Sequence, residues 1–258
     1  MKKYIKVFIY LLKFSLMDLI VYRWDLLFRN IGFALESWVI ILFFKVLYFN
    51  IPEINGWRYR DLLLIVAAYN ILEWLLYFFY EHNHRRLHQK VNRGELDNLL
   101  TKPLDAQVII SFKDINFQSF AGLFVGIFII FYVLKDPYTM VQLFSFILLF
   151  MVGAIIHYAI SLMIATISFF TPKMEDFRHI EGRFRDLAFY PVDIYPPILK
   201  FVFKTFLPIA FFTTVPAQAF SNPSPQLFVE AFMVAGIFLF LSRKFFLTGL
   251  KRYSSASS

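Results

Sequence analysis

Four residues that directly follow an apolar run have side chains able to bind metal ions: Glu81, His82, His84 and His88. Carboxylate and imidazole groups ligate zinc when three or four of them converge on one point. Polar residues just past the end of a hydrophobic stretch are also commonly a solvated cap. We expect the cap here, and we predict no metal site.

Ionisable residues also lie within or at the ends of apolar runs, where charge is costly. Glu36, Lys45, Glu73 and Glu230 could form a polar route or a proton-coupled site, or they could pair between helices or reach toward the headgroups. We expect pairing or headgroup contact, although Glu36 and Lys45 are too far apart along one helix to pair directly. His157 is expected to be packed and hydrogen-bonded.

Motifs for covalent or nucleotide chemistry are missing from the sequence. It contains no cysteine, which excludes a thiolate nucleophile, a disulfide frame and cysteine-bound metal. It also contains no G-x-x-x-x-G-K-[ST], no H-E-x-x-H and no G-x-S-x-G. We therefore predict no catalytic residues and no cofactor in this chain, which is not expected to be an enzyme by itself. A transport role would need an ion gradient or a separate ATPase.

The elements that must position these residues are membrane helices. The chain has 258 residues, of which 59% are hydrophobic, only 17% are charged and 35 are Phe, so lipid must surround much of it. A spanning helix needs about 20 apolar residues. Five runs meet this length: 31–49, 62–80, 115–134, 141–168 and 226–246.

A sixth apolar region, residues 189–220, is broken by prolines. Long continuous runs favour helices over a closed barrel. The sequence therefore predicts an all-α polytopic membrane protein with six transmembrane helices and one domain over residues 1–258.

The basic residues indicate the orientation of these helices. If both termini are cytoplasmic, twenty Lys and Arg residues lie on the inner side and three on the outer side. Such an asymmetry is typical of six crossings with both ends inside. The net charge of +8 is then a consequence of topology, and we expect no nucleic-acid partner.

Residues 1–27 have a helical pattern in which Lys2, Lys6 and Lys13 share one face and apolar side chains another. This pattern is typical of a helix lying in the membrane interface. A poorly formed first span is the alternative. We expect this segment to be retained and not cleaved as a signal peptide.

Small residues four apart can let membrane helices approach closely. Gly122 and Gly126 have this spacing in the third run, and Ala231 and Ala235 repeat it in the last. We expect helix packing at the glycines and a weaker effect at the alanines.

Residues 81–105 form a compact charged segment between two apolar runs. Apolar and basic residues alternate with helical spacing, Gly94 interrupts the pattern and Pro103 ends it. We expect a short amphipathic helix that docks into a groove on a partner. The apolar stripe consists of Leu87, Val91, Leu96, Leu99 and Leu100.

Two stretches resemble a known family. Residues 93–104, RGELDNLLTKPL, resemble the G-x-L-D-x-x-L-x-[RK]-P-L segment of ABC-2 type permeases, the membrane subunits of a class of bacterial ABC exporters. Residues 189–196, FYPVDIYP, with the later PIAF and VPA, are similar to a stretch near the fifth span of these permeases. Lys102 stands where Arg is more usual.

The resemblance implies a six-span permease paired with a second permease, identical or different, on two cytoplasmic ABC ATPase subunits that hold ATP and Mg. It implies that residues 81–105 are a coupling helix, that the 1–27 helix lies along the inner leaflet, and that residues 189–220 form a fifth span with re-entrant helices at an outer gate. The implied location is the bacterial cytoplasmic membrane, in contact with lipid.

Candidate site residues follow from these two stretches. The predicted ATPase-coupling residues are Arg85, Arg86, Arg93, Gly94, Glu95, Asp97, Lys102 and Pro103. The predicted gate residues are Pro191, Tyr195, Pro196, Pro208 and Pro216.

Two alternatives remain open. One is an ion-coupled secondary transporter with Glu36, Glu73 or Glu230 as the proton site. The other is a membrane scaffold that transports nothing. The transported substrate cannot be predicted from these residues.

Overall fold

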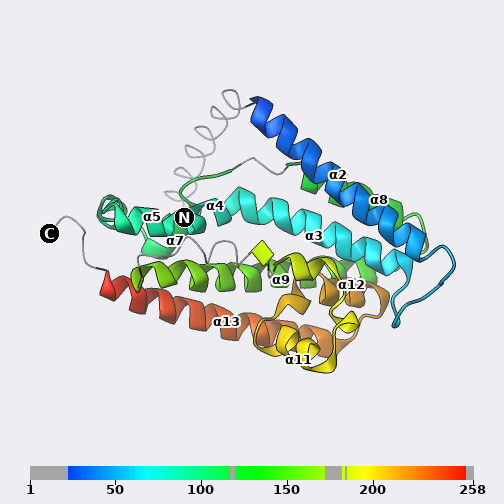
Figure 1. Ribbon diagram of the computed structural model, residues 1–258. Coiled ribbons are helices and arrows are strands. Elements are labelled where there is room, and N and C mark those ends of the chain that lie inside the picture. The colour runs from blue at the N-terminus through cyan, green and yellow to red at the C-terminus, as the bar shows by residue number, and fades with distance from the viewer. Residues whose placement is uncertain (1–22, 117–119, 172–181, 184, 254–258) are drawn as a thin grey trace.

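The computed structural model describes residues 23–116, 120–171, 182–183 and 185–253 (Figure 1). Four helical segments in this part of the chain are long and apolar enough to cross a membrane, and a fifth apolar helix is shorter. The first two are Trp24–Leu47, within α2 (Arg23–Leu47), and α3 (Tyr59–Phe79). The third is Met140–Phe169, which consists of α9 (Met140–Thr166) and η1 (Ile167–Phe169), and the fourth is α13 (Pro225–Arg252). The shorter helix is α8 (Phe120–Val133).

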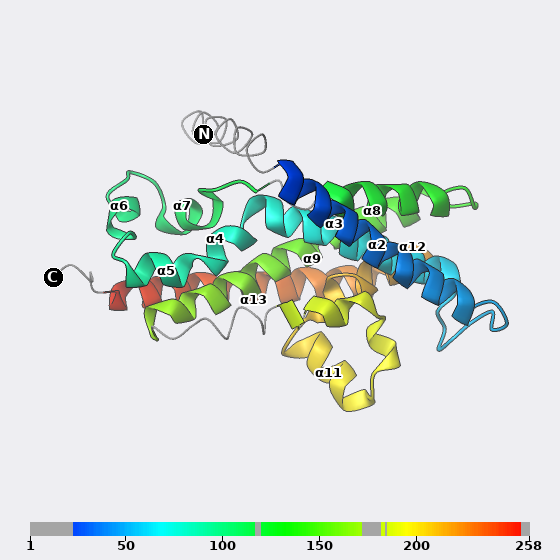
Figure 2. The same ribbon diagram turned by 45° about the horizontal axis from the view of Figure 1, so that its top comes forward.

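The long helices lie side by side as a bundle. α9 packs between α3 and α13, while α2 and α8 cover α3 from one side (Figures 1 and 2). α9 begins with a capping box, in which Thr139 Oγ1 accepts from the backbone of Gln142 and the Gln142 side chain accepts from the backbone of Thr139. α13 begins with Pro225 at its first turn, where a missing N–H costs nothing.

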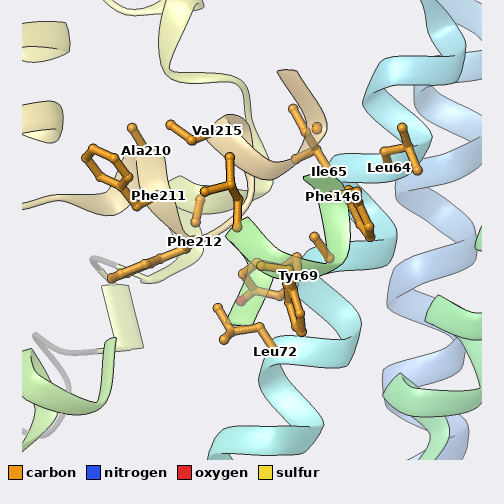
Figure 3. Packing of buried hydrophobic residues seen from close by; sticks show 14 of the residues in the cluster. Leu64, Ile65, Tyr69, Leu72, Phe146, Ala210, Phe211, Phe212 and Val215 are labelled. Atoms are coloured by element: carbon orange, nitrogen blue, oxygen red, sulfur yellow. The ribbon is translucent and has the colours of Figure 1, made fainter. Parts of the chain in front are cut away.

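The centre of the bundle is α3, whose residues from 61 to 70 are all buried. Ile65 and Leu72 are fully buried, and they face side chains of α9 and of the segment that includes Phe211 and Phe212 (Figure 3). α3 is therefore enclosed by other parts of the protein along this stretch. The surrounding helices are correspondingly exposed on their outer sides, as expected where lipid is the solvent.

Close packing at the glycines is confirmed. A Cβ added at Gly122 would lie 2.7 Å from the backbone oxygen of Asn70, and one added at Gly126 would lie 2.8 Å from the backbone oxygen of Ala67. α8 therefore contacts the backbone of α3 directly. The alanines of α13, Ala231 and Ala235, are buried as well.

Helix boundaries differ from the predicted ones near both ends of the first and third runs. α2 already includes Arg23, the first described residue, although the sequence predicts an interfacial helix to residue 27 and a span from 31. No residue between 23 and 31 breaks the helix, and Asn30 donates to the backbone oxygen of Leu26 at 2.7 Å. Residues 1–22 lie outside the described chain, so the interfacial helix stays a prediction. α8 is shorter than the predicted 115–134 span.

The broken region is broken as predicted. Residues 187–221 form five short pieces: η2 (Leu187–Phe189), η3 (Val192–Ile194), α11 (Pro197–Thr205), η4 (Ile209–Phe211) and α12 (Thr214–Ser221). Prolines stand at the starts of several pieces because proline cannot continue a helix from the residue before it. α11 stands out to one side of the bundle (Figure 2). No described helix here is long enough to span by itself, so six crossings remain a prediction.

Candidate functional site

Residues 81–105 lie at the end of the bundle where α3, α9 and α13 finish, which we call the basal end (Figure 1). They form three short helices, α4 (Glu81–Arg85), α5 (Leu87–Asn92) and α6 (Asp97–Leu100), and lead into α7 (Ala106–Phe112). The prediction of one short helix is wrong. Gly94 has φ of +70°, a left-handed conformation that ends a helix and that glycine adopts without strain.

The apolar stripe of this segment faces its own bundle. Leu87 and Leu96 are fully buried and Leu99 is 4% exposed, in a cluster that includes Leu162 of α9 and Phe246 of α13. The stripe is therefore already covered and is not free to fill a groove on a partner. Burial of several leucines holds the short helices on the bundle, at about 1.5–3 kcal/mol for each side chain.

The outward face of the segment is polar. Arg93 and Glu95 form an exposed ion pair at 3.8 Å. The predicted coupling residues fall into two groups by exposure. Those exposed are Arg86, Arg93, Glu95, Lys102 and Pro103, and those half-buried are Arg85, Gly94 and Asp97. Arg85 is set apart from the exposed residues, because it pairs with the buried Glu81.

An ion pair joins the end of this segment to the last helix. Arg243 of α13 donates to both carboxylate oxygens of Asp105, at 2.7 and 3.1 Å, and to the side-chain oxygen of Gln107 at 2.8 Å. Asp105 also caps α7 by accepting from the backbone of Gln107 and Val108. The hydrogen bond from Arg243 lowers the pKa of the Asp105 carboxyl. Two elements far apart in sequence are thereby fixed to each other.

A buried histidine joins the start of the segment to α9 and α7. Nδ1 of His84 lies 2.8 Å from Oγ of Ser161, and Nε2 lies 3.0 Å from Oγ of Ser111. Burial lowers the pKa of His84 to about 3, so its ring is neutral at physiological pH. Both ring nitrogens lie within hydrogen-bond distance of hydroxyl groups, so His84 holds α4 to α9 and α7. The predicted solvated cap is wrong for Glu81, His84 and His88, which are all buried.

A second anchor lies beside it, on the chain between α7 and α8. Lys90 pairs with Asp114 at 3.4 Å. Asn83 exchanges two hydrogen bonds with the backbone of the same residue, at 2.7 and 3.1 Å. Burial lowers the pKa of Lys90, and the Asp114 carboxylate opposes that effect. α4 and α5 are thus tied to the chain that leads toward the next membrane helix.

Four charged side chains form a cluster at the base of α3, which we call the ionic cluster: Glu73, Glu81 and Arg185, which are buried, and Arg85, which is half-buried. Arg185 pairs with Glu73 and donates to Glu81 at 2.8 Å, while Glu81 also pairs with Arg85. Burial raises the pKa of the Glu81 carboxyl, but the two arginines outweigh it and the net pKa is lowered. The expected pairing of Glu73 is confirmed.

Sequence reasoning missed Arg185, which it counted only as an inner-side charge. The signal that could have found it is a balance of charge: a carboxylate such as Glu73, deep in an apolar run, needs a cationic partner. The sequence separation of more than 100 residues concealed which cation it was.

The other ionisable residues of the apolar runs have different surroundings. Glu36 and Lys45 are exposed on α2, and Glu230 accepts a hydrogen bond from Gln226 at 2.8 Å. His157 is buried, with its Nδ1 3.2 Å from the hydroxyl of Tyr80. The prediction that His157 is packed and hydrogen-bonded is confirmed.

The predicted gate residues lie in the broken region. Pro191, Pro208 and Pro216 are buried, Tyr195 is half-buried and Pro196 is exposed. A hydrogen bond of 3.2 Å from Trp57 Nε1 to Asp193 holds this region to the loop between α2 and α3. The structure does not bring these residues into contact with the 81–105 segment, because α12 and that segment lie toward opposite ends of the bundle (Figure 1).

Comparison with known proteins decides the family. The sequence profile of ABC-2 family transporter proteins matches residues 34–257, which is most of the chain. The chain belongs to the ABC-2 family of transporter proteins. No curated protein and no solved structure shows significant similarity to it.

Membership of the ABC-2 family establishes several general properties of this chain. The chain is a multi-pass membrane protein, and its family has a transport function. Membrane proteins of this family lack an ATPase domain, so the family implies separate ATPase partner subunits. The ABC-2 permease thus needs a surface on which such a subunit can act.

Proposed function

We propose that this ABC-2 protein is the transmembrane permease subunit of an ATP-driven exporter. It has six crossings with both termini in the cytoplasm, and the broken 187–221 region forms the fifth crossing and the outer gate. It works by alternating access, paired with a second permease on two ATPase subunits that hold ATP and Mg. The basal end is then the cytoplasmic end.

The observation that carries this proposal is the charged face of residues 81–105. Exposed charges of both signs, including Arg93, Glu95 and Lys102, lie on a segment whose apolar side chains are buried in its own bundle. A surface of this kind suits a polar, salt-sensitive contact with a water-soluble subunit. The ATPase therefore contacts mainly the charges, and the leucines hold the segment to the membrane helices.

The anchors of the segment support a mechanical role. Asp105 is fixed to α13 by Arg243, and His84 is fixed to α9 by Ser161. A force applied to the short helices is consequently passed to two membrane helices. ATP binding can shift the equilibrium between the inward and outward states only if the ATPase binds these two states with different affinity. The anchored segment provides a contact with the ATPase that differs between the two states.

Co-purification tests the proposal. The tagged protein, extracted in mild detergent, should bring down an ATPase subunit. Reversing two exposed charges with Arg93→Glu and Lys102→Glu should weaken that association and its ATP-dependent transport. Arg58→Glu is the matched control, because Arg58 is exposed in the loop between α2 and α3 at the other end of the bundle. The proposed contact would be contradicted if the parent protein, the variant with both Arg93→Glu and Lys102→Glu, and the Arg58→Glu control all bound the ATPase subunit equally.

Transport in purified vesicles separates this function from the alternative. Gradient-driven transport by the protein alone, without any ATPase subunit, would replace the proposal with an ion-coupled transporter.

A further inference from the structure

The proposed contact between residues 81–105 and the ATPase does not explain why Arg185 is buried among charged residues. Its side chain is 6% exposed and lies between two carboxylates that are 5% and 0% exposed, those of Glu73 and Glu81. The ring of Tyr77 lies against the guanidinium groups of both Arg185 and Arg85, with 5.8 and 5.6 Å from ring centroid to guanidinium carbon. Two carboxylates and two guanidinium groups thus balance in charge, and only Arg85 among them is partly exposed.

Arg185 and the two carboxylates that it joins belong to three different parts of the protein. Glu73 is in the membrane helix α3, and Glu81 is the first residue of α4, where the 81–105 segment begins. Arg185 itself lies two residues before η2, the first piece of the broken region. The ionic cluster is therefore the place where the 81–105 segment and the chain leading to the predicted gate contact each other.

From Arg185 the contact continues toward the middle of the bundle. Asp186 accepts a hydrogen bond from the hydroxyl of Tyr69 at 3.1 Å. The ring of Tyr69 stacks on Phe189, with 3.6 Å between centroids. A displacement of Arg185 thus acts on residues that hold η2 against α3.

Arg185 has two carboxylate partners, so it can lose one of them and still be paired with the other. If α4 moves away, Arg185 keeps Glu73, and Glu81 keeps Arg85, so no charge is left buried without a counter-ion. A buried arginine that lost its only partner would make such a movement very costly. The cluster can therefore exchange between two discrete arrangements, as a switching element must.

We propose that Arg185 is the positioning residue that transmits movement of α4 to the broken region 187–221. This inference rests on the proposed function and names the residue that connects its two ends. Arg185 makes no contact with the exposed charges at which the ATPase would bind, so it affects the response to nucleotide and leaves subunit association unchanged.

A single introduced cysteine provides the test, since the chain contains none of its own. Ile194 in η3 is exposed, and Ile194→Cys reports on the broken region through its rate of maleimide labelling. In the complex with ATPase subunits, trapping the ATP-bound state should change that rate. Arg185→Gln should abolish the change while the ATPase subunits still co-purify.

Two further variants keep the test decisive if Arg185→Gln folds poorly. The double variant Arg185→Met/Glu73→Gln leaves Glu81 paired with Arg85 and no unpaired buried charge, so it should fold and still fail to respond. Ile129→Ala truncates a buried side chain of α8, away from the ionic cluster and from the leucines that hold the 81–105 segment, and should lower the melting temperature while keeping the response.

A nucleotide response in Arg185→Gln or the double variant equal to that of the parent would overturn this inference and leave the proposed function standing. A parent that does not respond would also overturn it. Failure of any ATPase subunit to co-purify with the parent would instead overturn the proposed function.

Discussion

Replacing Gly122 by alanine should force α8 away from α3. The added Cβ would lie 2.7 Å from the backbone oxygen of Asn70, whereas ordinary contact begins at 3.4 Å, so the helices must separate by about 0.7 Å. Asn70 cannot turn aside, because the blocking atom is backbone and its side chain is held by Ser37 at 2.6 Å and by the backbone oxygen of Val66 at 2.8 Å.

The size of the effect follows from two opposing terms. Overpacking a close contact costs about 1–3 kcal/mol. Alanine is a better helix former than glycine by about 1 kcal/mol, which offsets part of that cost. The net loss for Gly122→Ala is about 1 kcal/mol, which corresponds to a fall in melting temperature of about 2–4 °C for a chain of this length.

Thermal melting in detergent measures this, with Gly236→Ala as the matched control. A Cβ at Gly236 on α13 would meet no atom of the chain within 4 Å, so only the gain in helix propensity remains and the melting temperature should stay the same or rise. If Gly122→Ala is as stable as Gly236→Ala, the close contact between α8 and α3 is not present in the folded protein.

Three other changes have expected outcomes. Asp105→Asn should weaken the tie to Arg243, cost about 1 kcal/mol in thermal melting and reduce ATP-dependent transport more than it reduces subunit association. His84 is neutral when folded, with its pKa lowered from 6.5 to about 3, and takes up a proton when unfolded. The contribution of His84 to the unfolding free energy should therefore be constant above pH 6.5 and fall by about 1.4 kcal/mol per pH unit below it, and His84→Gln should reduce the total slope by that amount. Trp57→Phe removes the hydrogen bond to Asp193, which should cost about 1 kcal/mol and increase maleimide labelling of a cysteine placed in η3; unchanged labelling would show that this bond does not hold the region.

Much of the architecture was predictable because lipid imposes it. Continuous apolar runs gave the positions of α3, α9 and α13, and the spacing of Gly122 and Gly126 gave the contact between α8 and α3. Prolines predicted that residues 189–220 would be broken. These features depend on residues that are close together in the sequence, so the sequence alone indicates them.

The details of the basal end were less predictable because they depend on distant partners. An apolar stripe predicts that a helix packs on something, but does not say whether Leu87 and Leu96 face a partner or their own bundle. The ties between Asp105 and Arg243, and between Glu81 and Arg185, cross more than 100 residues. Charge balance predicts that a buried carboxylate has a cation, and only the fold shows which one.

Site-specific photo-crosslinking tests the central claim most directly, that residues 81–105 are the contact for the ATPase. A photoreactive residue at Asn98, which is exposed in α6, should form an adduct with the ATPase subunit in the intact complex. The same residue at the exposed Asn55, in the loop between α2 and α3, should form none. An ATPase adduct from position 55, or its absence from position 98 in a complex that still hydrolyses ATP, would contradict the account.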